Sequence, residues 1–396
     1  MFTLLPVQNG LDNVEGFFCQ GVHAGFKPNQ KEDVAFIRTD EPCDVSGIFT
    51  SNVFQAAPIK HFLRYPKGFQ TNFILMNAKN ANAMTGEKGI EDIDTLFAKL
   101  QTIFPNLHHP IMSSTGVIGY RLNVDKMVLA FEKFDFNAKD SHSTASAIMT
   151  TDSFKKELCL KVILEDGSFF HIAAICKGAG MINPAMATML CFILTDAAIP
   201  KADMDALLLP AVQASFNSVS VDGDTSTNDT VLLLSSRKSG VYEKEAFNEA
   251  LKRITQELSL MLVRDGEGST KVVAFEVSGA QNDDEAERAA KALSNSLLVK
   301  TALFGEDPNW GRIASTIGAS GITCNEESLV IHYDDVLIYS KDQRSLDDQT
   351  EKKAAEVMKK ASFRIRCELG IADGSFTAYG CDLGHRYVEI NADYRT

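Results

Sequence analysis

The residues with the clearest chemical potential lie between Lys177 and Leu190, where the sequence reads KGAGMINPAMATML. Two glycines and a proline constrain a loop that leads into an apolar run, residues 189–194, which we expect to form a buried strand with Thr188 at its edge. A threonine hydroxyl is a weak nucleophile on its own. If the bond between Ala187 and Thr188 were cut, the new α-amine of Thr188, with a usual pKa of about 7.7 to 8.0, could accept the hydroxyl proton. The block therefore predicts an N-terminal threonine nucleophile, and the structural alternative is a glycine-rich turn before a strand.

The spacing of the other reactive residues argues against nucleotide and metal sites. The glycines of this loop follow neither G-x-G-x-x-G nor G-x-x-x-x-G-K-S/T, the two common phosphate-binding patterns. His108 and His109 are adjacent, which cannot place both on one strand face or at the i, i+4 spacing of a helical zinc site, so we interpret them as loop residues. The eight cysteines contain no C-x-x-C pair, and we therefore expect no metal and reduced, mostly buried thiols.

Composition describes a folded, acidic protein. Hydrophobic residues make up 45% and charged residues 23% of the 396 residues, which is the balance of a globular chain of one large or two fused domains. The formal charge of 39 − 52 = −13 would repel phosphate backbones and anionic lipids, which argues against nucleic-acid and membrane partners. The first residues show no basic or long apolar targeting segment, and polar residues interrupt the most apolar run, residues 181–199. We therefore expect a cytoplasmic protein.

The elements that must position these residues follow from hydrophobic periodicity. Short β-branched or aromatic runs predict strands, three- and four-residue spacing predicts amphipathic helices, and strict alternation predicts a strand with one buried face. The strands are expected at 72–76, 160–164, 272–277 and 363–369, and the helices at 284–298, with Leu297 on the buried face, and at 345–362. Helices and strands do not alternate regularly, which favours an α+β fold in layers over a doubly wound sheet, and composition gives no clean domain boundary.

Several further blocks occur in the order found in one enzyme family. They read NANAMTG at 80–86, STGVIG at 114–119, TTD at 150–152, SVDGDTSTND at 220–229 and FGEDPNWGR at 304–312. Together with the threonine block they make the chain resemble, over essentially its whole length, the ornithine acetyltransferases, also called glutamate N-acetyltransferases or ArgJ proteins. Lys79 and Met84 depart from the family pattern at positions that are assigned no chemistry.

The resemblance implies a fold, a processing event and a reaction. The fold would be a layered α/β sandwich of the self-cleaving DmpA/ArgJ type, and the chain would cut itself into an α chain, 1–187, and a β chain, 188–396, that assemble as a heterotetramer. The enzyme would move an acetyl group from N2-acetylornithine to L-glutamate in arginine biosynthesis, by ping-pong kinetics through an acetyl-threonine, with no metal and no organic cofactor. Acetyl-CoA is a second donor in bifunctional members, and the sequence does not decide whether this chain uses it.

The resemblance also implies roles for individual residues. Thr188 would be the nucleophile, and Thr115 and Gly116 would form the oxyanion hole, because a glycine beside a hydroxyl lets both donors approach a developing negative charge. The implied substrate-binding residues are one or both of Thr150 and Thr151, together with Lys177, Thr188, Glu267, Asn391 and Thr396. In this set Lys177 would meet a carboxylate and Glu267 an ammonium.

Each of these residues has a plainer structural interpretation. Lys177 and Glu267 could be a surface charge and a helix cap, and Asn391 and Thr396 could be a strand end and a frayed terminus.

Two other functions also stay open, a self-cleaving amidase or aminopeptidase in which water replaces glutamate, and a non-catalytic amino-acid-binding protein. Donor and acceptor differ in side-chain charge, so one site must tolerate both signs, and the sequence does not locate the groups that achieve this.

Overall fold

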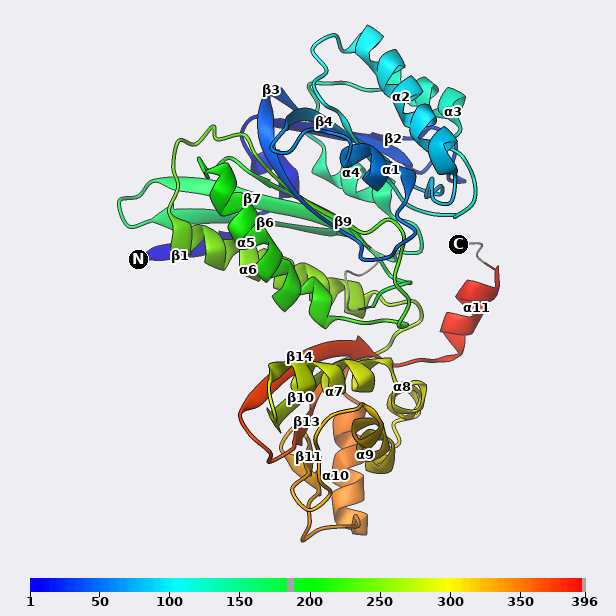
Figure 1. The fold of residues 1–396 in the computed structure, drawn as a ribbon, viewed down its shortest axis with the longest axis vertical. Helices are drawn as coiled ribbons and strands as arrows, with labels where there is room; N and C mark the ends of the chain where they lie inside the picture. The colour runs from blue at the N-terminus through cyan, green and yellow to red at the C-terminus, as the bar shows by residue number, and fades with distance from the viewer. Residues whose placement is uncertain (184–188, 394–396) are drawn as a thin grey trace.

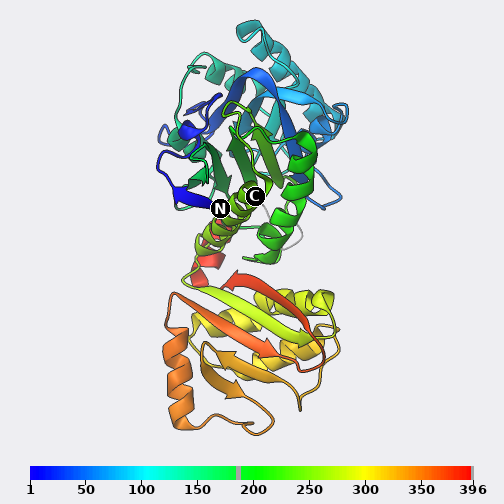
Figure 2. The same cartoon turned by 90° about the vertical axis from the view of Figure 1, so that its left-hand side faces the viewer.

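Two β-sheets, each with its own helices and buried core, form the protein in a computed structural model that describes residues 1–183 and 189–393. Figure 1 shows the N-terminal body, residues 1–264, above the C-terminal body, residues 272–384, and Figure 2 shows the same two bodies from the side. The chain passes between them through residues 265–271 and returns in α11 (His385–Asp393), which lies near the N-terminal body.

The N-terminal body is built on a nine-stranded sheet with the order β1-β6-β7-β8-β9-β3-β4-β5, and β2 pairs with β3. The strands are β1 (Phe2–Pro6), β2 (Phe17–Val22), β3 (Val34–Phe49), β4 (Gln70–Asn77), β5 (Ile111–Ser114), β6 (Lys156–Leu164), β7 (Phe169–Lys177), β8 (Leu190–Thr195) and β9 (Thr230–Ser235). The central strands β8 and β9 are buried on both faces, which explains their continuous apolar sequences. Alternate residues of β8 face two different cores, with Ile193 in one and Phe192 in the other.

Helices cover both faces of this sheet. The helices of the body are α1 (Ala57–Phe62), α2 (Gly86–Ile103), α3 (Val124–Phe131), α4 (Ser141–Ile148), α5 (Lys201–Ala214) and α6 (Lys244–Arg264), with 3-10 turns at Gly10–Asn13 and Phe216–Ser218. Residues of α5 and α6 share a core with one face, and residues of α4 share a core with the other. This arrangement confirms the predicted α+β layers.

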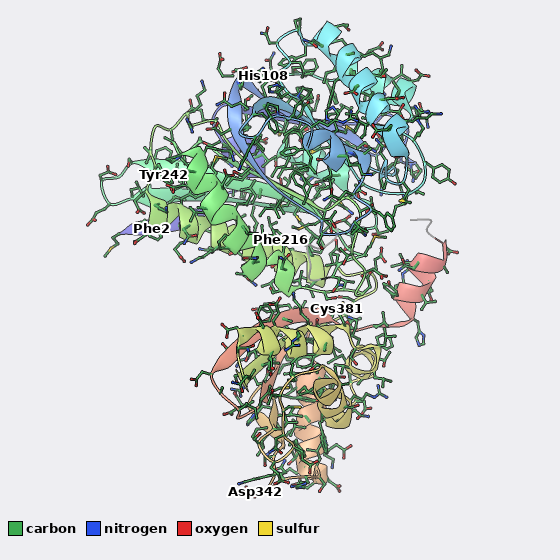
Figure 3. The ribbon with its side chains drawn as sticks, viewed as in Figure 1. Phe2, His108, Phe216, Tyr242, Asp342 and Cys381 are labelled. Carbon is green, nitrogen blue, oxygen red and sulfur yellow. The ribbon has the colours of Figure 1, made fainter. Side chains whose placement is uncertain are left out.

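The C-terminal body contains a five-stranded sheet with the order β12-β11-β13-β10-β14. Its elements are β10 (Val272–Ala280), α7 (Asp283–Asn295), α8 (Leu297–Phe304), α9 (Trp310–Ala319), β11 (Val330–Tyr333), β12 (Val336–Tyr339), α10 (Asp348–Met358), β13 (Ser362–Glu368) and β14 (Gly374–Cys381). The two bodies meet at β14, where Cys381 packs into the core that contains Phe216 (Figure 3). The Ser220 N–H also donates to the Tyr379 carbonyl at 2.9 Å.

The predicted strands at 72–76, 160–164, 272–277 and 363–369 are confirmed in β4, β6, β10 and β13, the last ending at residue 368. The single helix predicted at 284–298 was wrong at its end, because α7 stops at Asn295 and Ser296 caps α8 by accepting the Val299 N–H. Leu297 therefore starts a new helix and is 65% exposed instead of buried. The helix predicted at 345–362 is observed over a shorter range, in α10, and the Asp347 side chain caps its start.

Candidate functional site

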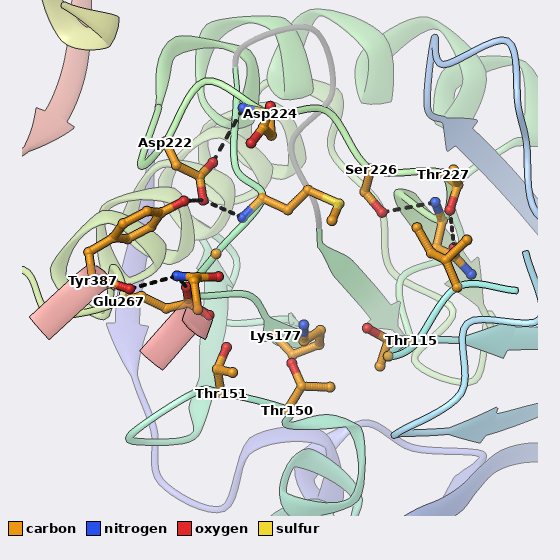
Figure 4. Close-up of a pocket in the computed structure, with 16 residues that line it drawn as sticks. Thr115, Thr150, Thr151, Lys177, Asp222, Asp224, Ser226, Thr227, Glu267 and Tyr387 are labelled. Atoms are coloured by element: carbon orange, nitrogen blue, oxygen red, sulfur yellow. Dashed lines mark hydrogen bonds between the residues drawn. The ribbon is translucent and has the colours of Figure 1, made fainter. Parts of the chain in front are cut away.

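A cavity of about 120 Å³ lies beyond the end of β7, where loops from distant parts of the chain meet (Figure 4). That volume is well below the ~300–1,000 Å³ of sites for drug-sized ligands, and it suits a small substrate. The predicted site residues that line it are Thr115, Gly116, Thr150, Thr151, Lys177, Glu267 and Asn391. The other predicted site residues, Ala187, Thr188 and Thr396, lie outside the described residues.

The turn after β5 carries Thr115 and Gly116. Gly116 has φ +131°, and a Cβ there would lie 2.3 Å from the Lys79 carbonyl carbon and 2.5 Å from the Asn80 nitrogen, so only glycine fits. The Thr115 N–H donates to the Asn77 carbonyl at 3.0 Å, which leaves its hydroxyl as the donor that this residue can offer to the cavity. The geometry is compatible with an oxyanion site made of one hydroxyl and one glycine N–H.

Asn228 holds this turn in place. Its side-chain amide donates to the carbonyls of Ala81 at 2.6 Å and Ser114 at 2.9 Å, and thereby ties β5 to the neighbouring loop. Asn228 lines the cavity and is 6% exposed. Asn228 belongs to the SVDGDTSTND block. That block contributes to the family resemblance, but the sequence assigns no contact to Asn228.

Lys177 is the last residue of β7, and its side chain is buried. Its Nζ lies 4.0 Å from Asp152 Oδ2, and the same oxygen accepts the Thr150 N–H at 2.9 Å. The other oxygen, Oδ1, accepts the Gly178 N–H at 2.6 Å. Lys177 is therefore not a solvated surface charge. Asp152 holds it beside a loop in which Thr150 and Thr151 both line the cavity, so both are candidate substrate contacts.

Glu267 faces the cavity from the connection after α6 and is 7% exposed, which excludes a surface helix cap. Its Oε2 accepts the Asn391 side-chain N–H at 2.7 Å, and its backbone N–H donates to the Ala179 carbonyl at 2.9 Å. At Gly180 a Cβ would lie 2.5 Å from the Glu267 Cδ, so a side chain there would displace the carboxylate. Asn391 belongs to α11, so it is not a strand end.

Asp222 and Tyr387 are cavity residues that the sequence did not predict. Asp222 accepts the N–H groups of Met181 at 2.6 Å and Ile182 at 2.9 Å, and the Tyr387 hydroxyl donates to it at 3.3 Å. Burial raises the pKa of Asp222, and the backbone hydrogen bonds oppose that rise. Asp222 thus fixes the turn that precedes residues 184–188, and Tyr387 gives α11 a second attachment. No local spacing signals a contact between residues 165 positions apart.

Asp229 holds the backbone on the other side of residues 184–188. Its Oδ1 accepts the Met189 N–H at 3.0 Å, and the residue is only 1% exposed. Burial raises the pKa of this carboxyl well above its usual value, while the bond from Met189 and the charge of Lys177 act in the opposite direction.

The remaining sequence predictions concern metals and thiols. All eight cysteines are free and seven are buried, as predicted. His108 and His109 lie in the connection between α2 and β5, also as predicted. Within residues 1–183 and 189–393, no group of three or more His, Cys, Asp and Glu side chains is arranged to hold a metal ion. No helix in that part of the chain is long and apolar enough to cross a membrane.

Comparison with known protein families and with individual proteins points to one family. The model of the ArgJ family matches residues 18–396. The arginine biosynthesis bifunctional protein ArgJ of Wolinella succinogenes is 56% identical over 396 residues, covering 100% of both chains, and that of Chlorobaculum tepidum is 39% identical, covering 99% of this chain and 98% of the relative.

Two solved structures are also similar. The arginine biosynthesis bifunctional protein ArgJ of Bacillus halodurans has 37% identity and a TM-score of 0.49, covering 51% of this chain and 98% of that chain. The ornithine acetyltransferase of Mycobacterium tuberculosis, solved in complex with ornithine, has 25% identity and a TM-score of 0.41, covering 48% of this chain and 100% of that chain.

Proposed function

The chain belongs to the ArgJ family, and on that premise we propose that it transfers an acetyl group from N2-acetylornithine to L-glutamate in arginine biosynthesis. The observation that carries the proposal is the cavity, in which buried Lys177 and buried Glu267 offer charges of opposite sign to one small ligand. An amino acid presents a carboxylate and an ammonium, which are the matching groups.

The first step of the proposed mechanism is self-cleavage. The Thr188 hydroxyl attacks the Ala187 carbonyl, the acyl group shifts from nitrogen to oxygen, and water hydrolyses the ester to give chains 1–187 and 188–396. The α-amine released on Thr188 then becomes the base for the hydroxyl of the same residue. Fixed backbone on both sides supports this step, because Asp222 holds the Met181 and Ile182 N–H groups and Asp229 holds that of Met189.

Turnover follows as two half-reactions at one site. Thr188 attacks the acetyl carbonyl of N2-acetylornithine, the Thr115 hydroxyl and the Gly116 N–H stabilise the oxyanion, and ornithine leaves behind an acetyl-threonine. Glutamate then enters and accepts the acetyl group. Lys177 binds the α-carboxylate that both amino acids share, and Glu267 meets an ammonium group. Asn391 and the Thr396 hydroxyl orient the rest of the substrate, and Thr150 and Thr151 complete the contacts. Acetyl-CoA as a second donor, a heterotetramer and a cytoplasmic location belong to the same proposal.

Denaturing mass spectrometry beside a Thr188→Ala control tests the nucleophile. Two fragments that meet at Ala187 and Thr188, with an intact control, support the proposal, and an intact parent chain would instead favour an amino-acid-binding protein. The acceptor is tested by incubating the cleaved enzyme with N2-acetylornithine alone and then with glutamate. A lasting acetyl-enzyme that glutamate discharges supports transfer, whereas steady release of free acetate without glutamate would favour the amidase alternative.

A further inference from the structure

Four buried charges lie at or just behind the cavity wall, and one of them, Lys177, lines the cavity itself. Lys156 Nζ is 2.8 Å from Asp152 Oδ1 and 2.5 Å from Asp265 Oδ2, and Lys177 Nζ is 4.0 Å from Asp152 Oδ2. The exposed fractions of these four side chains are between 0 and 4%. Asp152, Lys156, Asp265 and Lys177, which we call the charge network, carry two negative and two positive charges and therefore sum to zero. The carboxylates of Glu267 and Asp222, which line the cavity, are not part of this network.

The charges of Asp152 and Lys156 are stabilised by their partners. Burial alone would raise the pKa of Asp152, but the ammonium groups of Lys177 and Lys156 outweigh it and lower that pKa. Burial alone would lower the pKa of Lys156, and the two carboxylates raise it instead. Isolated charges would be very unfavourable at this depth, so the network persists because each charge has a partner.

Three of the four members of the network line the cavity or lie within two residues of a lining residue. Asp152 follows Thr151, Lys177 itself lines the cavity, and Asp265 precedes Glu267 by two residues. Asp265 also accepts the Ser153 backbone N–H at 3.1 Å and the Ser153 hydroxyl, which joins the loop of Thr151 to the connection that carries Glu267. The network thus spans both ends of the proposed substrate site.

We propose that the zero net charge of this network is a specificity device that lets one cavity bind a cationic and an anionic amino acid in turn. The inference rests on the proposed function, in which ornithine carries a net charge of +1 and glutamate of −1. Buried charges are poorly screened, so a net charge beneath the cavity would favour one amino acid at the expense of the other. Lys156 and Asp265 touch no substrate in this scheme and act as positioning residues that set the potential at the site.

Asp265→Asn tests the proposal, because it removes one negative charge and leaves the side chain nearly unchanged in shape. The network then carries +1. We expect the dissociation constant of ornithine, measured by calorimetry on the cleaved enzyme, to rise by about 3- to 10-fold, and that of glutamate to fall by a similar factor. Opposite shifts identify an electrostatic effect, since a loosened site would weaken both ligands.

Two further variants separate charge from packing. Ser153→Ala removes a hydroxyl that contacts Asp265 without changing any charge, so we expect less than about a twofold change for either ligand. The double variant Lys156→Gln with Asp265→Asn returns the net charge to zero. We expect its ratio of the two dissociation constants to return toward the wild-type ratio, although it carries one more substitution in the buried network than Asp265→Asn.

The outcomes also distinguish this inference from the proposed function. Equal weakening of both ligands by Asp265→Asn, or no change for either, overturns the charge network as a specificity device while acetyl transfer by the wild type stands. A wild type that binds both amino acids but transfers no acetyl group overturns the proposed function, and the opposite shifts in Asp265→Asn still support the network. A wild type that binds neither amino acid overturns both.

Discussion

Gly116 is the residue of the candidate site with the strictest steric requirement. We expect Gly116→Ala to reduce acetyl transfer by about 100-fold or more, because the added methyl group would push the turn away from Lys79 and Asn80 and displace an oxyanion donor. Gly119→Ala is the matched control. It has a positive φ in the same loop, +92°, but open space around its Cβ, so only the backbone strain is shared. Equal losses of acetyl transfer in both variants would show that backbone strain alone causes the loss, and not displacement of the oxyanion donor.

Asp229 gives a prediction about pH. Its folded-state pKa lies above the unfolded value of about 3.9, so its contribution to stability is fully present below about pH 4 and is lost as the pH rises through the folded pKa. Asp229→Asn has no such proton to lose and can still accept from the Met189 N–H. We therefore expect the variant to gain stability relative to the parent as the pH rises, by up to about 1.4 kcal/mol per pH unit.

Denaturant unfolding at several pH values between 4 and 8 measures this difference. A Thr188→Ala background suits the comparison, because it keeps the chain in one piece in the proposed mechanism. Asp342→Asn changes an exposed carboxyl and serves as the control. A constant difference between Asp229→Asn and its parent over this range would contradict the prediction.

At the residue scale, sequence reasoning found the side chains to which the family resemblance assigns a role and missed those whose role is a long-range contact. The resemblance names Lys177, Glu267 and Thr115, and all three line one cavity. Tyr387 was missed because its hydroxyl reaches Asp222 across 165 positions, and only the folded backbone brings them together. The same reason hides the pairing of Lys156 with Asp265.

At the scale of elements, α11 is the part of the fold whose attachment matters most for the site. We expect Asn391→Ala to raise the KM for N2-acetylornithine by about 10-fold while self-cleavage continues, because the Glu267 carboxylate loses a hydrogen bond that orients it. Glu389→Gln is the control on the same helix, since its exposed carboxylate pairs with Arg386 and not with the cavity. If self-cleavage stopped in Asn391→Ala, α11 would be needed for maturation and not for substrate alone.

Periodicity predicted the strands well, because a buried pleated surface imposes a clear pattern on β4, β6, β10 and β13. It failed where α8 follows α7 directly and the helical spacing of apolar residues continues from one helix into the next. The apolar spacing continues across Ser296, and only the capping bond to Val299 reveals that α7 has ended. The two-body arrangement could not be predicted, since residues 265–271, DGEGSTK, have the composition of any short loop and the division depends on which strands pair.

At the scale of the whole molecule, the order of strands decides what self-cleavage would do to the assembly. In the nine-stranded sheet, β8 and β9 belong to the proposed chain 188–396, and they lie between β7 and β3, which belong to chain 1–187. Both borders are hydrogen-bonded, with Lys177 opposite Leu190 on one side and Leu232 opposite Gly47 on the other. The two chains would share one sheet and the cores on both of its faces.

We therefore expect cleavage to leave the native molecule intact. Native mass spectrometry of the parent should show one particle containing both chains in equal number, with the same oligomeric state as uncut Thr188→Ala, while denaturing conditions should separate the parent into its two fragments. Separation would require breaking two strand borders and exposing the central strands, which are fully buried. Free fragments under native conditions would contradict the interleaved sheet, and an uncut parent would contradict the cleavage itself, so the two measurements together test the architecture and the maturation step separately.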